Sequence, residues 1–454
     1  MPAKNMDELV ALCKRRGFVF QSGEIYGGLK GCYDYGPMGI EVKNNLRKAW
    51  WNSLIYDRDD IEGLESSLLN NRLVWKHSGH EDGFSDPLVE CKACHSRMRE
   101  DKMKDRSKCD NCGSTDLMEP RAFHLMMKVN IGPVESDDSY GYLRAETAQT
   151  TYVNFKNVMD STSQKIPFGI AQMGKSFRNE ITPRNFVFRM REFEQLEMQY
   201  FVNPKEDEKF YDEWKKIRLD WWVKQGINSE NLKFEDHGPD DLAHYAKAAA
   251  DIEYKFPHGF DELEGIHNRQ DFDLGSHTKA QEDFDIKAKV LPNKDSNSKL
   301  NYVDPQTKEN YIPFVVETAM GGDRGFVAIL NEAYTVEDLG EGKTRTVLKF
   351  AKHIAPVKVA VIPLARNNEE LVGKARELHS ALKKLQLGRV VFENTGNIGK
   401  NYRKHDEIGT PMCITVDFDT IEKGLVTVRD RDTMEQTVVK FDEIVDFVKD
   451  FYNK

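Results

Sequence analysis

The segment from residue 174 to residue 201, GKSFRNEITPRNFVFRMREFEQLEMQYF, carries four arginines and four glutamates among aromatic and apolar residues. Guanidinium groups bind phosphate oxygens and keep their charge at neutral pH, and carboxylates accept hydrogen bonds from an ammonium group. An aromatic ring can stack on a purine. These residue types predict a site for a nucleotide beside a small amine. Cross-strand ion pairs on a half-exposed hairpin would explain the same residues, so this segment alone leaves both interpretations open.

Two further segments favour the binding site. GYLRAETAQTTYVNF places Arg144 and Glu146 before a helix-like run, and VVETAMGGDRGF places Glu317 and Arg324 on either side of a double glycine. Glycine allows a backbone to approach a ligand closely, and the following arginine opens a helix. The three segments together predict a ligand pocket more strongly than any one of them.

Four of the seven cysteines form a separate pattern. Cys91 and Cys94 are one C-x-x-C pair, and Cys109 and Cys112 are a second pair after fourteen intervening residues. This spacing is typical of a zinc ribbon, in which four thiolates hold a structural Zn²⁺ and leave no position for water. A coincidental spacing, or a site that has lost its metal, is the alternative. Paired cysteines of this kind also indicate a reducing compartment.

The charged segment is expected to form two antiparallel strands joined by a long loop, ITPRNFVF. Because side chains alternate along a strand, Leu196, Met198 and Tyr200 are expected on the core side. The ligand side is expected to present Arg178, Glu180, Arg189, Arg191, Phe193, Gln195 and Glu197.

The rest of the chain supplies the scaffold. Helices are expected at the N-terminus (MDELVALCKRRGF), from about Ile40 to Ile55, as a charged surface helix from Pro204, and at the start of DDLAHYAKAAADIEYKF, a helical segment that runs into a strand. After a boundary near residues 352–357, strands separated by helices predict a small α/β domain. Residues 357–411 hold ten Lys/Arg and six Asp/Glu, which is either a solvated helix face or an RNA-contacting surface.

Composition restricts the possible classes of protein. The chain has 454 residues, 39% of them hydrophobic, which is enough for two or more domains. No apolar run approaches the ~20 residues that span a bilayer, and the first residues lack a signal-peptide core. The net charge of −10 argues against a general coat of basic residues. We expect a cytoplasmic protein that does not enter the membrane.

Several of these segments resemble a known family. FRNE followed by a loop and REFEQLE resembles motif 2 of the class II aminoacyl-tRNA synthetases, ETAMGGDR resembles motif 3, and YDYGPMGIEVKNNLRKAWW resembles the motif 1 region. Within the class, IYGGLKGCYDYGPMG, SGHEDGFSDPLVECKAC, LRAETAQ, ELEGIHNRQDFDL and HDEIGTPMCITVDFD are similar to homodimeric glycyl-tRNA synthetases over essentially the whole chain.

The resemblance implies an α+β fold in which a class II antiparallel-sheet catalytic domain, residues 1–352, carries a zinc-ribbon-like insert, residues 91–112. An α/β anticodon-binding domain is expected at residues 353–454. The implied activity is ATP-dependent attachment of glycine to the 3′ end of tRNA(Gly) through glycyl-adenylate, with Mg²⁺ as activator and a homodimer as the assembly.

The resemblance also implies roles for individual residues. Arg178, Glu180 and Arg324 are implied in catalysis, and Glu262 as a possible Mg²⁺ ligand. The implied ATP-binding residues are Arg178, Asn179, Glu180, Phe188, Arg189, Met190, Arg191, Glu192, Phe193, Glu262, Leu263, Gly321, Gly322, Asp323 and Arg324. The implied glycine-binding residues are Arg99, Glu146, Phe193, Glu194, Gln195, Leu196, Glu197, Arg269, Glu317, Thr318, Ala319, Met320 and Gly321.

The chain departs from the family at the amino-acid pocket. The family usually has Glu-Pro-Ser at the start of motif 3, whereas this chain has Glu317, Thr318 and Ala319, and LRAETAQ has alanine where proline is usual. Two alternatives stay open at this point. One is a catalytically inactive, synthetase-like accessory protein that binds nucleic acid, and the other is a synthetase for another small amino acid.

Overall fold

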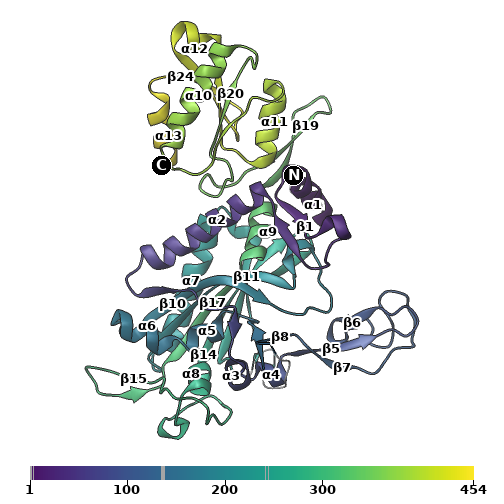
Figure 1. Cartoon of the computed structure of the whole chain (residues 1–454), viewed down its shortest axis with the longest axis vertical. Helices are drawn as coiled ribbons and strands as arrows, with labels where there is room; N and C mark the ends of the chain where they lie inside the picture. The colour runs from purple at the N-terminus through teal and green to yellow at the C-terminus, as the bar shows by residue number, and fades with distance from the viewer. Residues whose placement is uncertain (1–2, 4, 134–138, 241, 244, 454) are drawn as a thin grey trace.

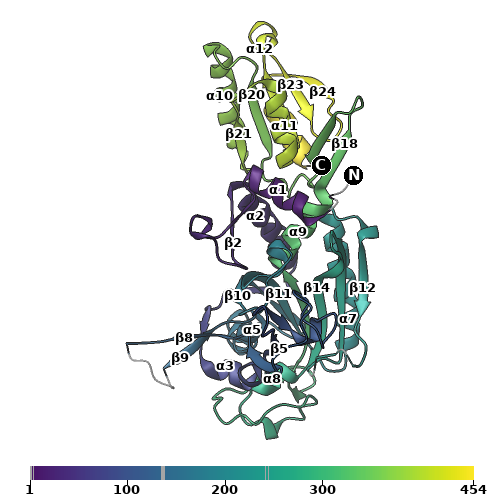
Figure 2. The same cartoon turned by 90° about the vertical axis from the view of Figure 1, so that its right-hand side faces the viewer.

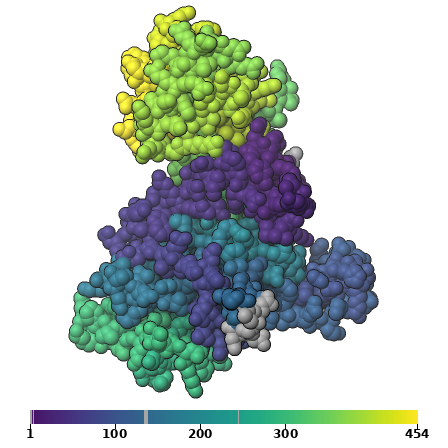
Figure 3. Space-filling model, viewed as in Figure 1, coloured from purple at the N-terminus to yellow at the C-terminus, as the bar shows by residue number. Residues whose placement is uncertain are grey.

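The computed structural model describes residues 3, 5–133, 139–240, 242–243 and 245–453. A large body contains the first three quarters of the chain, and a smaller C-terminal domain stands at one end of it (Figure 1). A β-hairpin insert projects sideways from the body, and it is visible as a separate lobe in the space-filling view (Figure 3). The fold is therefore α+β, as the sequence predicted.

The body is built on one seven-stranded sheet. The strand order is β12-β13-β14-β17-β11-β10-β3, and every neighbouring pair is antiparallel except β10 and β3. The strands are β3 (Ile61–Leu64), β10 (Phe168–Phe177), β11 (Glu192–Val202), β12 (Leu232–Asp236), β13 (Ala248–Phe256), β14 (Gly259–Gln270) and β17 (Phe314–Gly321).

Helices cover both faces of this sheet (Figure 2). On one face the main core is formed with α1 (Met6–Arg16), α2 (Pro37–Trp51), α7 (Asp207–Lys224) and α9 (Gly322–Ala333). On the other face a second core is formed with α5 (Ala148–Tyr152), α6 (Phe155–Thr162) and α8 (Phe272–His277). Each strand can therefore bury apolar side chains against the helices and carry polar side chains at its other positions.

Local sequence explains the ends of the expected helices. Asn5 accepts a hydrogen bond from the Glu8 amide at the start of α1, and Gly17 ends it in the left-handed conformation, as caps of these types do. α2 begins with Pro37, where a missing amide hydrogen costs nothing, and continues into a π-helical turn, Asn52–Tyr56. Both predicted helices are confirmed.

Two elements differ from the sequence expectations. The described residues 242–243 and 245–247 do not form the expected helix, and the strand expected after it, β13, already begins at Ala248, because both of its edges pair with neighbouring strands. The charged helix α7 is not simply a surface helix. It buries Trp214, Trp222 and the Arg218 guanidinium, whose Nε lies 2.7 Å from Glu264 inside the core.

Short elements complete the body. The insert contains β5 (Ser85–Glu90), β6 (Arg97–Arg99) and β7 (Arg121–His124), and it follows α3 (Arg72–His77) and α4 (His80–Gly83). The remaining short strands are β1 (Val19–Gln21), β2 (Tyr33–Tyr35), β4 (Leu69–Asn70), β8 (Met127–Asn130), β9 (Tyr140–Leu143), β15 (Tyr302–Val303), β16 (Asn310–Tyr311), β18 (Tyr334–Asp338) and β19 (Thr344–Leu348). Single 3₁₀ turns lie at Glu24–Tyr26, Glu100–Lys102, Phe186–Phe188, Ser229–Asn231 and Gln281–Asp283.

The C-terminal domain has its own five-stranded sheet and its own core. The strand order is β21-β20-β22-β23-β24, and Val359, Leu371, Ile414 and Ile444 are among its buried residues. Its elements are β20 (Val359–Pro363), α10 (Glu369–Lys383), β21 (Val390–Phe392), α11 (Ile398–Ile408), β22 (Met412–Val416), α12 (Phe418–Lys423), β23 (Leu425–Asp430), β24 (Gln436–Lys440) and α13 (Ile444–Asn453).

The exact boundary between the domains at residues 352 and 353 stays a prediction. Ile354, Ala355 and Val357 pack into the core of the body. Among the residues that the structure describes, no helix combines the length and the apolar character that crossing a bilayer requires.

Candidate active site

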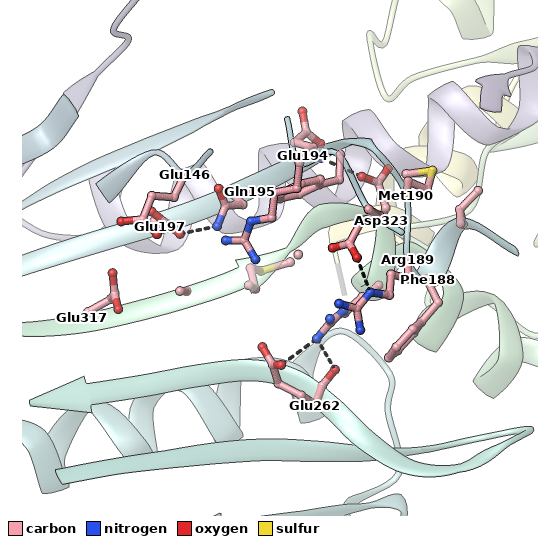
Figure 4. Close-up of a pocket in the computed structure, with 18 of the residues that line it drawn as sticks. Glu146, Phe188, Arg189, Met190, Glu194, Gln195, Glu197, Glu262, Glu317 and Asp323 are labelled. Atoms are coloured by element: carbon pink, nitrogen blue, oxygen red, sulfur yellow. Dashed lines mark hydrogen bonds and ion pairs between the residues drawn. The ribbon is translucent and has the colours of Figure 1, made fainter. Parts of the chain in front are cut away.

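A cavity of about 370 Å³ lies on the polar side of the central strands β11, β14 and β17 (Figure 4). Its walls also include the turn before α5 and the connection between β10 and β11. The lining residues are Glu146, Arg178, Glu180, Val187, Phe188, Arg189, Met190, Phe193, Glu194, Gln195, Glu197, Tyr245, Glu262, His267, Arg269, Glu317, Ala319, Met320, Gly321, Asp323 and Arg324.

Strand register explains how this wall is assembled. Glu197 lies opposite Ala319, and Gln195 lies opposite Gly321, across the antiparallel pair β11 and β17. Because alternate side chains share a face, these residues point into the cavity, while Leu196 and Met198 belong to the core on the other side. The predicted alternation along this part of β11 is confirmed.

Three carboxylates gather at one end of the cavity. Glu146 comes from the turn before α5, Glu197 from β11 and Glu317 from β17 (Figure 4). The Thr147 hydroxyl donates to Glu197, and Gln195 Nε2 donates to Glu197 Oε1 at 2.6 Å. Burial, together with the charges of Glu317 and Glu146, raises the pKa of Glu197 to about 8.

The other two carboxylates each lie beside a nitrogen-bearing side chain. His80 Nε2 lies 3.4 Å from Glu146 Oε2, and Arg269 Nη1 donates to Glu317 Oε2 at 3.0 Å. Although burial opposes ionisation, His80 holds the pKa of Glu146 well below its usual value, and Arg269 lowers the pKa of Glu317 to about 2. The carboxylate end thus holds two ionised groups and one that titrates near neutral pH.

Arginines occupy the other end of the cavity. Arg324 Nη1 lies 2.8 Å from Glu262 Oε2, and Arg189 Nε donates to Glu180 Oε2 at 2.8 Å. Arg178 donates from Nε to the Ala145 carbonyl at 3.1 Å, which leaves its terminal amino groups available to the cavity. These residues bring concentrated positive charge to a concave surface, which suits a polyphosphate.

Two aromatic rings lie beside these arginines. The Arg178 guanidinium lies 5.2 Å from the centre of the Phe193 ring, and that of Arg324 lies 4.5 Å from the centre of the Phe188 ring. Cation–π contacts of this kind hold both partners in place. Flat apolar surface next to guanidinium groups matches a purine next to phosphates.

Asp323 and Glu194 line the cavity but are committed to a structural cluster. Asp323 accepts hydrogen bonds from Lys43 Nζ and Tyr35 Oη, both at 2.6 Å, and from the Glu194 amide at 2.7 Å. Although burial opposes ionisation, Lys43 lowers the pKa of Asp323. The cluster joins the start of α9 to α2 and β11, so it fixes the position of the neighbouring Arg324.

Several predicted site residues do not line the cavity. Arg191 turns away and donates to the Lys30 carbonyl at 2.6 Å, and Arg99 lies in the insert, 2.9 Å from Asp86. The shared ligand face predicted for Arg189 and Arg191 is therefore wrong for Arg191, because β11 begins only at Glu192. The other predicted residues outside the lining are Asn179, Glu192, Leu196, Leu263, Thr318 and Gly322. Their roles toward a ligand stay predictions.

Gly322 and Arg144 have clear structural roles. A Cβ atom on Gly322 would come within 2.8 Å of the side-chain ends of both Glu194 and Leu196, so a larger residue here would have to displace them. Arg144 is buried and donates to the Lys175 carbonyl at 2.7 Å and to Gln172 at 2.7 Å. It supports the turn that carries Glu146 and does not line the cavity.

The sequence analysis missed three lining residues, Val187, Tyr245 and His267. His267 Nδ1 lies 3.0 Å from Glu317 Oε2. Alternation along β14 places it on the same face as Arg269, which is a signal that the sequence contained. Tyr245 packs its ring 3.9 Å from the Arg269 guanidinium, and it comes from a segment that was expected to be helical.

The cysteine cluster lies in the projecting insert, away from this cavity. Sγ of Cys91 is 3.6 Å from Sγ of Cys112, and Sγ of Cys94 is 3.6 Å from Sγ of Cys109. All four sulfur atoms lie within 4.8 Å of one another, and none is in a disulfide. Tetrahedral Zn²⁺ with Zn–S bonds of about 2.3 Å would separate its sulfur ligands by about 3.8 Å, so the cluster fits zinc.

The two cysteine turns have matching backbones. The Cys91 amide donates to the Ser96 carbonyl and the Cys109 amide donates to the Ser114 carbonyl, both at 2.9 Å. The residue after each second cysteine, His95 or Gly113, has positive φ. This repeated turn is what brings each C-x-x-C pair of thiols to one point.

Comparison with protein families gives two matches. Residues 133–334 match the tRNA synthetase class II core domain (G, H, P, S and T), and residues 358–451 match the anticodon binding domain. The first match contains most of the cavity, and the second coincides with the C-terminal domain.

Curated relatives match over the full length. The chain is 50% identical to glycine--tRNA ligase of Thermus thermophilus and 48% identical to that of Deinococcus radiodurans, with 99% of this chain and 99% of each relative covered. It is 46% identical to glycine--tRNA ligase of Borreliella burgdorferi, with 98% and 97% covered.

A solved structure has the same fold. Giardia lamblia prolyl-tRNA synthetase in complex with prolyl-adenylate matches with a TM-score of 0.68 and 16% sequence identity, covering 98% of this chain and 76% of that one.

Proposed function

The chain belongs to the glycine--tRNA ligase family of class II synthetases, and on this premise we propose that its cavity holds glycine at the carboxylate end and ATP at the arginine end. The protein is an ATP-dependent ligase that attaches glycine to tRNA. The alternative of an inactive accessory protein is not supported. The observation that carries the proposal is the division of one cavity into an anionic end and a cationic end.

Glycine suits the carboxylate end in charge and in size. Its ammonium group would lie between Glu146, Glu197 and Glu317 and donate hydrogen bonds to these carboxylates. Hydrogen bonds between charged partners are strong. Ala319 forms the adjacent wall, because it follows Glu317 by two residues on β17 and lies opposite Glu197 on β11. A larger amino acid would have to place its Cβ against this wall, so steric exclusion can select glycine without a second, editing site.

ATP suits the arginine end. Its phosphates would replace the carboxylates that now pair with the guanidiniums, Glu262 on Arg324 and Glu180 on Arg189. Phe193 offers its ring to adenine. The glycine carboxylate oxygen attacks the α-phosphorus, the bond to pyrophosphate breaks, and arginines offset the negative charge that spreads over the phosphoryl oxygens. Catalysis is then mostly positioning of the two substrates, with no covalent intermediate on the protein.

Mg²⁺ fits this site as a partner of the bound nucleotide. Glu262 supplies one carboxylate at the edge of the cavity, and Mg²⁺ is usually held by one or two carboxylates together with substrate phosphates and water. When bound, the ion would neutralise phosphate charge. Glu262 is paired with Arg324 in the present structure, so nucleotide binding would give each of them a new partner.

Further proposals rest on family membership. We infer tRNA(Gly) as the tRNA, the C-terminal domain as the part that binds its anticodon, a structural Zn²⁺ in the cysteine cluster, a homodimer as the assembly and the cytoplasm as the compartment. Arg99 pairs with Asp86 outside the cavity lining, and its contact with substrate rests on the family resemblance alone.

A crossed pair of variants tests the two ends of the cavity. Glu197→Gln should raise the KM for glycine in pyrophosphate exchange and leave the KM for ATP nearly unchanged. Arg324→Ala should lose roughly 2–4 kcal/mol of transition-state stabilisation and impair ATP use while the protein remains folded. Exposed Arg97→Ala in the insert is the control. Near-normal exchange in Arg324→Ala, or a raised ATP KM with normal glycine KM in Glu197→Gln, would contradict the assignment.

A further inference from the structure

Gln149 connects the two sides of the carboxylate end from behind the cavity. It lies on α5, is buried and does not line the cavity. Its Nε2 atom donates to Glu146 Oε1 at 3.2 Å and to Asp273 Oδ1 at 3.0 Å. One amide group therefore supplies its two hydrogens to two different carboxylates.

The neighbours of Gln149 fix the direction of its amide. His277 Nε2 lies 3.0 Å from Gln149 Oε1, and burial lowers the pKa of His277 to about 3, so this ring is neutral and donates its single proton. Glu146 and Asp273 can only accept. The reversed amide would place its oxygen against two carboxylates, so only one orientation satisfies all three neighbours.

Asp273 extends the connection to the opposite wall. It is fully buried and receives two hydrogen bonds from Arg269, at 2.7 Å and 2.9 Å. Arg269 in turn donates to Glu317 at 3.0 Å. A continuous path of hydrogen bonds thus runs from Glu146 through Gln149, Asp273 and Arg269 to Glu317.

Glu146 has a competing partner on its other oxygen. His80 Nε2 lies 3.4 Å away, and the Ser78 hydroxyl is hydrogen-bonded to the other nitrogen of this ring at 2.8 Å. Without the Gln149 donor, the attraction to His80 would act on Glu146 unopposed. The carboxylate would then lose the orientation that Gln149 gives it.

We propose that Gln149 is a positioning residue for amino-acid binding, which aligns Glu146 and, through Asp273 and Arg269, Glu317 to receive the glycine ammonium together. This inference rests on the glycine placement proposed above. Gln149 touches neither substrate. Its effect should therefore be confined to the amino-acid end of the cavity and should not reach the ATP end.

The test replaces the side-chain amide of Gln149 with an apolar group of similar volume. Gln149→Met should raise the glycine KM in pyrophosphate exchange by about tenfold or more, since donors to charged groups are lost, and should keep the ATP KM within about twofold. Gln149→Asn retains an amide that is one methylene too short to reach both carboxylates, so it should also raise the glycine KM. Gln225→Met is the control, because Gln225 is a buried glutamine on the far side of the sheet, bonded to the Trp221 carbonyl and His353.

The outcomes separate this inference from its premise. A normal glycine KM in both Gln149 variants, with Glu146→Gln strongly impaired, overturns the role of Gln149 alone. Equal rises in the glycine and ATP KM, with a melting temperature below that of Gln225→Met, would make Gln149 a general packing residue and would also overturn it. A normal glycine KM in Glu146→Gln would contradict the proposed position of glycine itself.

Discussion

At the scale of single residues, position 319 distinguishes this pocket from the family pattern. Ala319 lines the cavity opposite Glu197, at the position where the family resemblance led us to expect a serine hydroxyl. Thr318 is buried outside the lining, so its hydroxyl does not replace the missing one. Ammonium recognition therefore depends on the carboxylates and the residues that hold them.

Restoring the hydroxyl should strengthen glycine binding. Ala319→Ser is expected to lower the glycine KM by roughly threefold to tenfold, which corresponds to one hydrogen bond of about 1 kcal/mol, with the ATP KM unchanged. Thr318→Val is the matched control and should leave the glycine KM as it is. An unchanged glycine KM in Ala319→Ser would mean that the wall at this position makes no contact with the substrate.

The raised pKa of Glu197 predicts a pH dependence of glycine affinity. Its pKa of about 8 means that Glu197 is protonated at pH 6 to 7, whereas an ammonium ion binds the ionised form. The glycine KM should therefore fall as pH rises toward 8, by at most about tenfold per pH unit, and then level off. Glu197→Gln should lack this slope. A wild-type glycine KM that is constant from pH 6 to pH 8.5 would refute the assignment.

Residue patterns predicted the charged residues of the site. They missed residues that reach the cavity only through the tertiary fold. Glu146, Glu197, Glu317 and Arg324 were singled out from spacing, and the structure brings them into one cavity. Tyr245 was missed because its segment was expected to form a helix, whereas the chain at this residue is irregular, so helical periodicity could not predict where its side chain points.

At the scale of elements, the insert is expected to depend on its metal. Its strands are short and the described residues around Cys91, Cys94, Cys109 and Cys112 offer little apolar core, so the Zn²⁺–thiolate bonds would supply most of the folding energy. One equivalent of zinc per chain should be found by metal analysis of protein never exposed to chelator. Less than a tenth of an equivalent would contradict the prediction.

A cysteine variant separates this site from the other thiols. Cys109→Ser should lose the zinc and make the insert sensitive to protease, with the body still folded. Cys32→Ser, which changes a half-buried cysteine outside the cluster, should keep a full equivalent of zinc. Equal zinc content in the two variants would show that the cluster does not bind the metal.

Element types were predictable where local signals agreed and not where pairing overrode them. α1 has its cap residues and its apolar period in the same segment, and it was predicted correctly. β13 begins with three alanines, which favour helix, yet pairing with β12 and β14 makes it a strand. The strand expected at the end of this segment therefore extends back over the alanines.

At the scale of the whole molecule, the C-terminal domain is fixed to the body through the end of α11. Ile408 packs into the core of the body, and a Cβ atom on Gly409 would come within 2.5 Å of Phe350. Beside it, Asp406 accepts a hydrogen bond of 2.8 Å from Arg429 of its own domain. Asp406 also lies 3.0 Å from Arg345 on the β18–β19 hairpin of the body. This contact sets the distance between the active site and the domain proposed to bind the anticodon.

Loosening this contact should affect tRNA charging more than glycine activation. Arg345→Met removes the buried interdomain charge pair and is expected to raise the KM for tRNA(Gly) several-fold, with glycine-dependent pyrophosphate exchange unchanged. Lys343→Met, on the same hairpin but paired only with Glu341 at the surface, is the control. A drop in pyrophosphate exchange equal to the drop in charging would show that the pair stabilises the body and does not position the domain.

The measurement that tests the central claim most directly is amino-acid-dependent ATP–pyrophosphate exchange by the purified protein with Mg²⁺. If the cavity activates glycine as its two charged ends indicate, glycine should support exchange without tRNA, and alanine should not at equal concentration. Absence of glycine-dependent exchange by folded, zinc-containing protein, or equal exchange with alanine, would contradict the account.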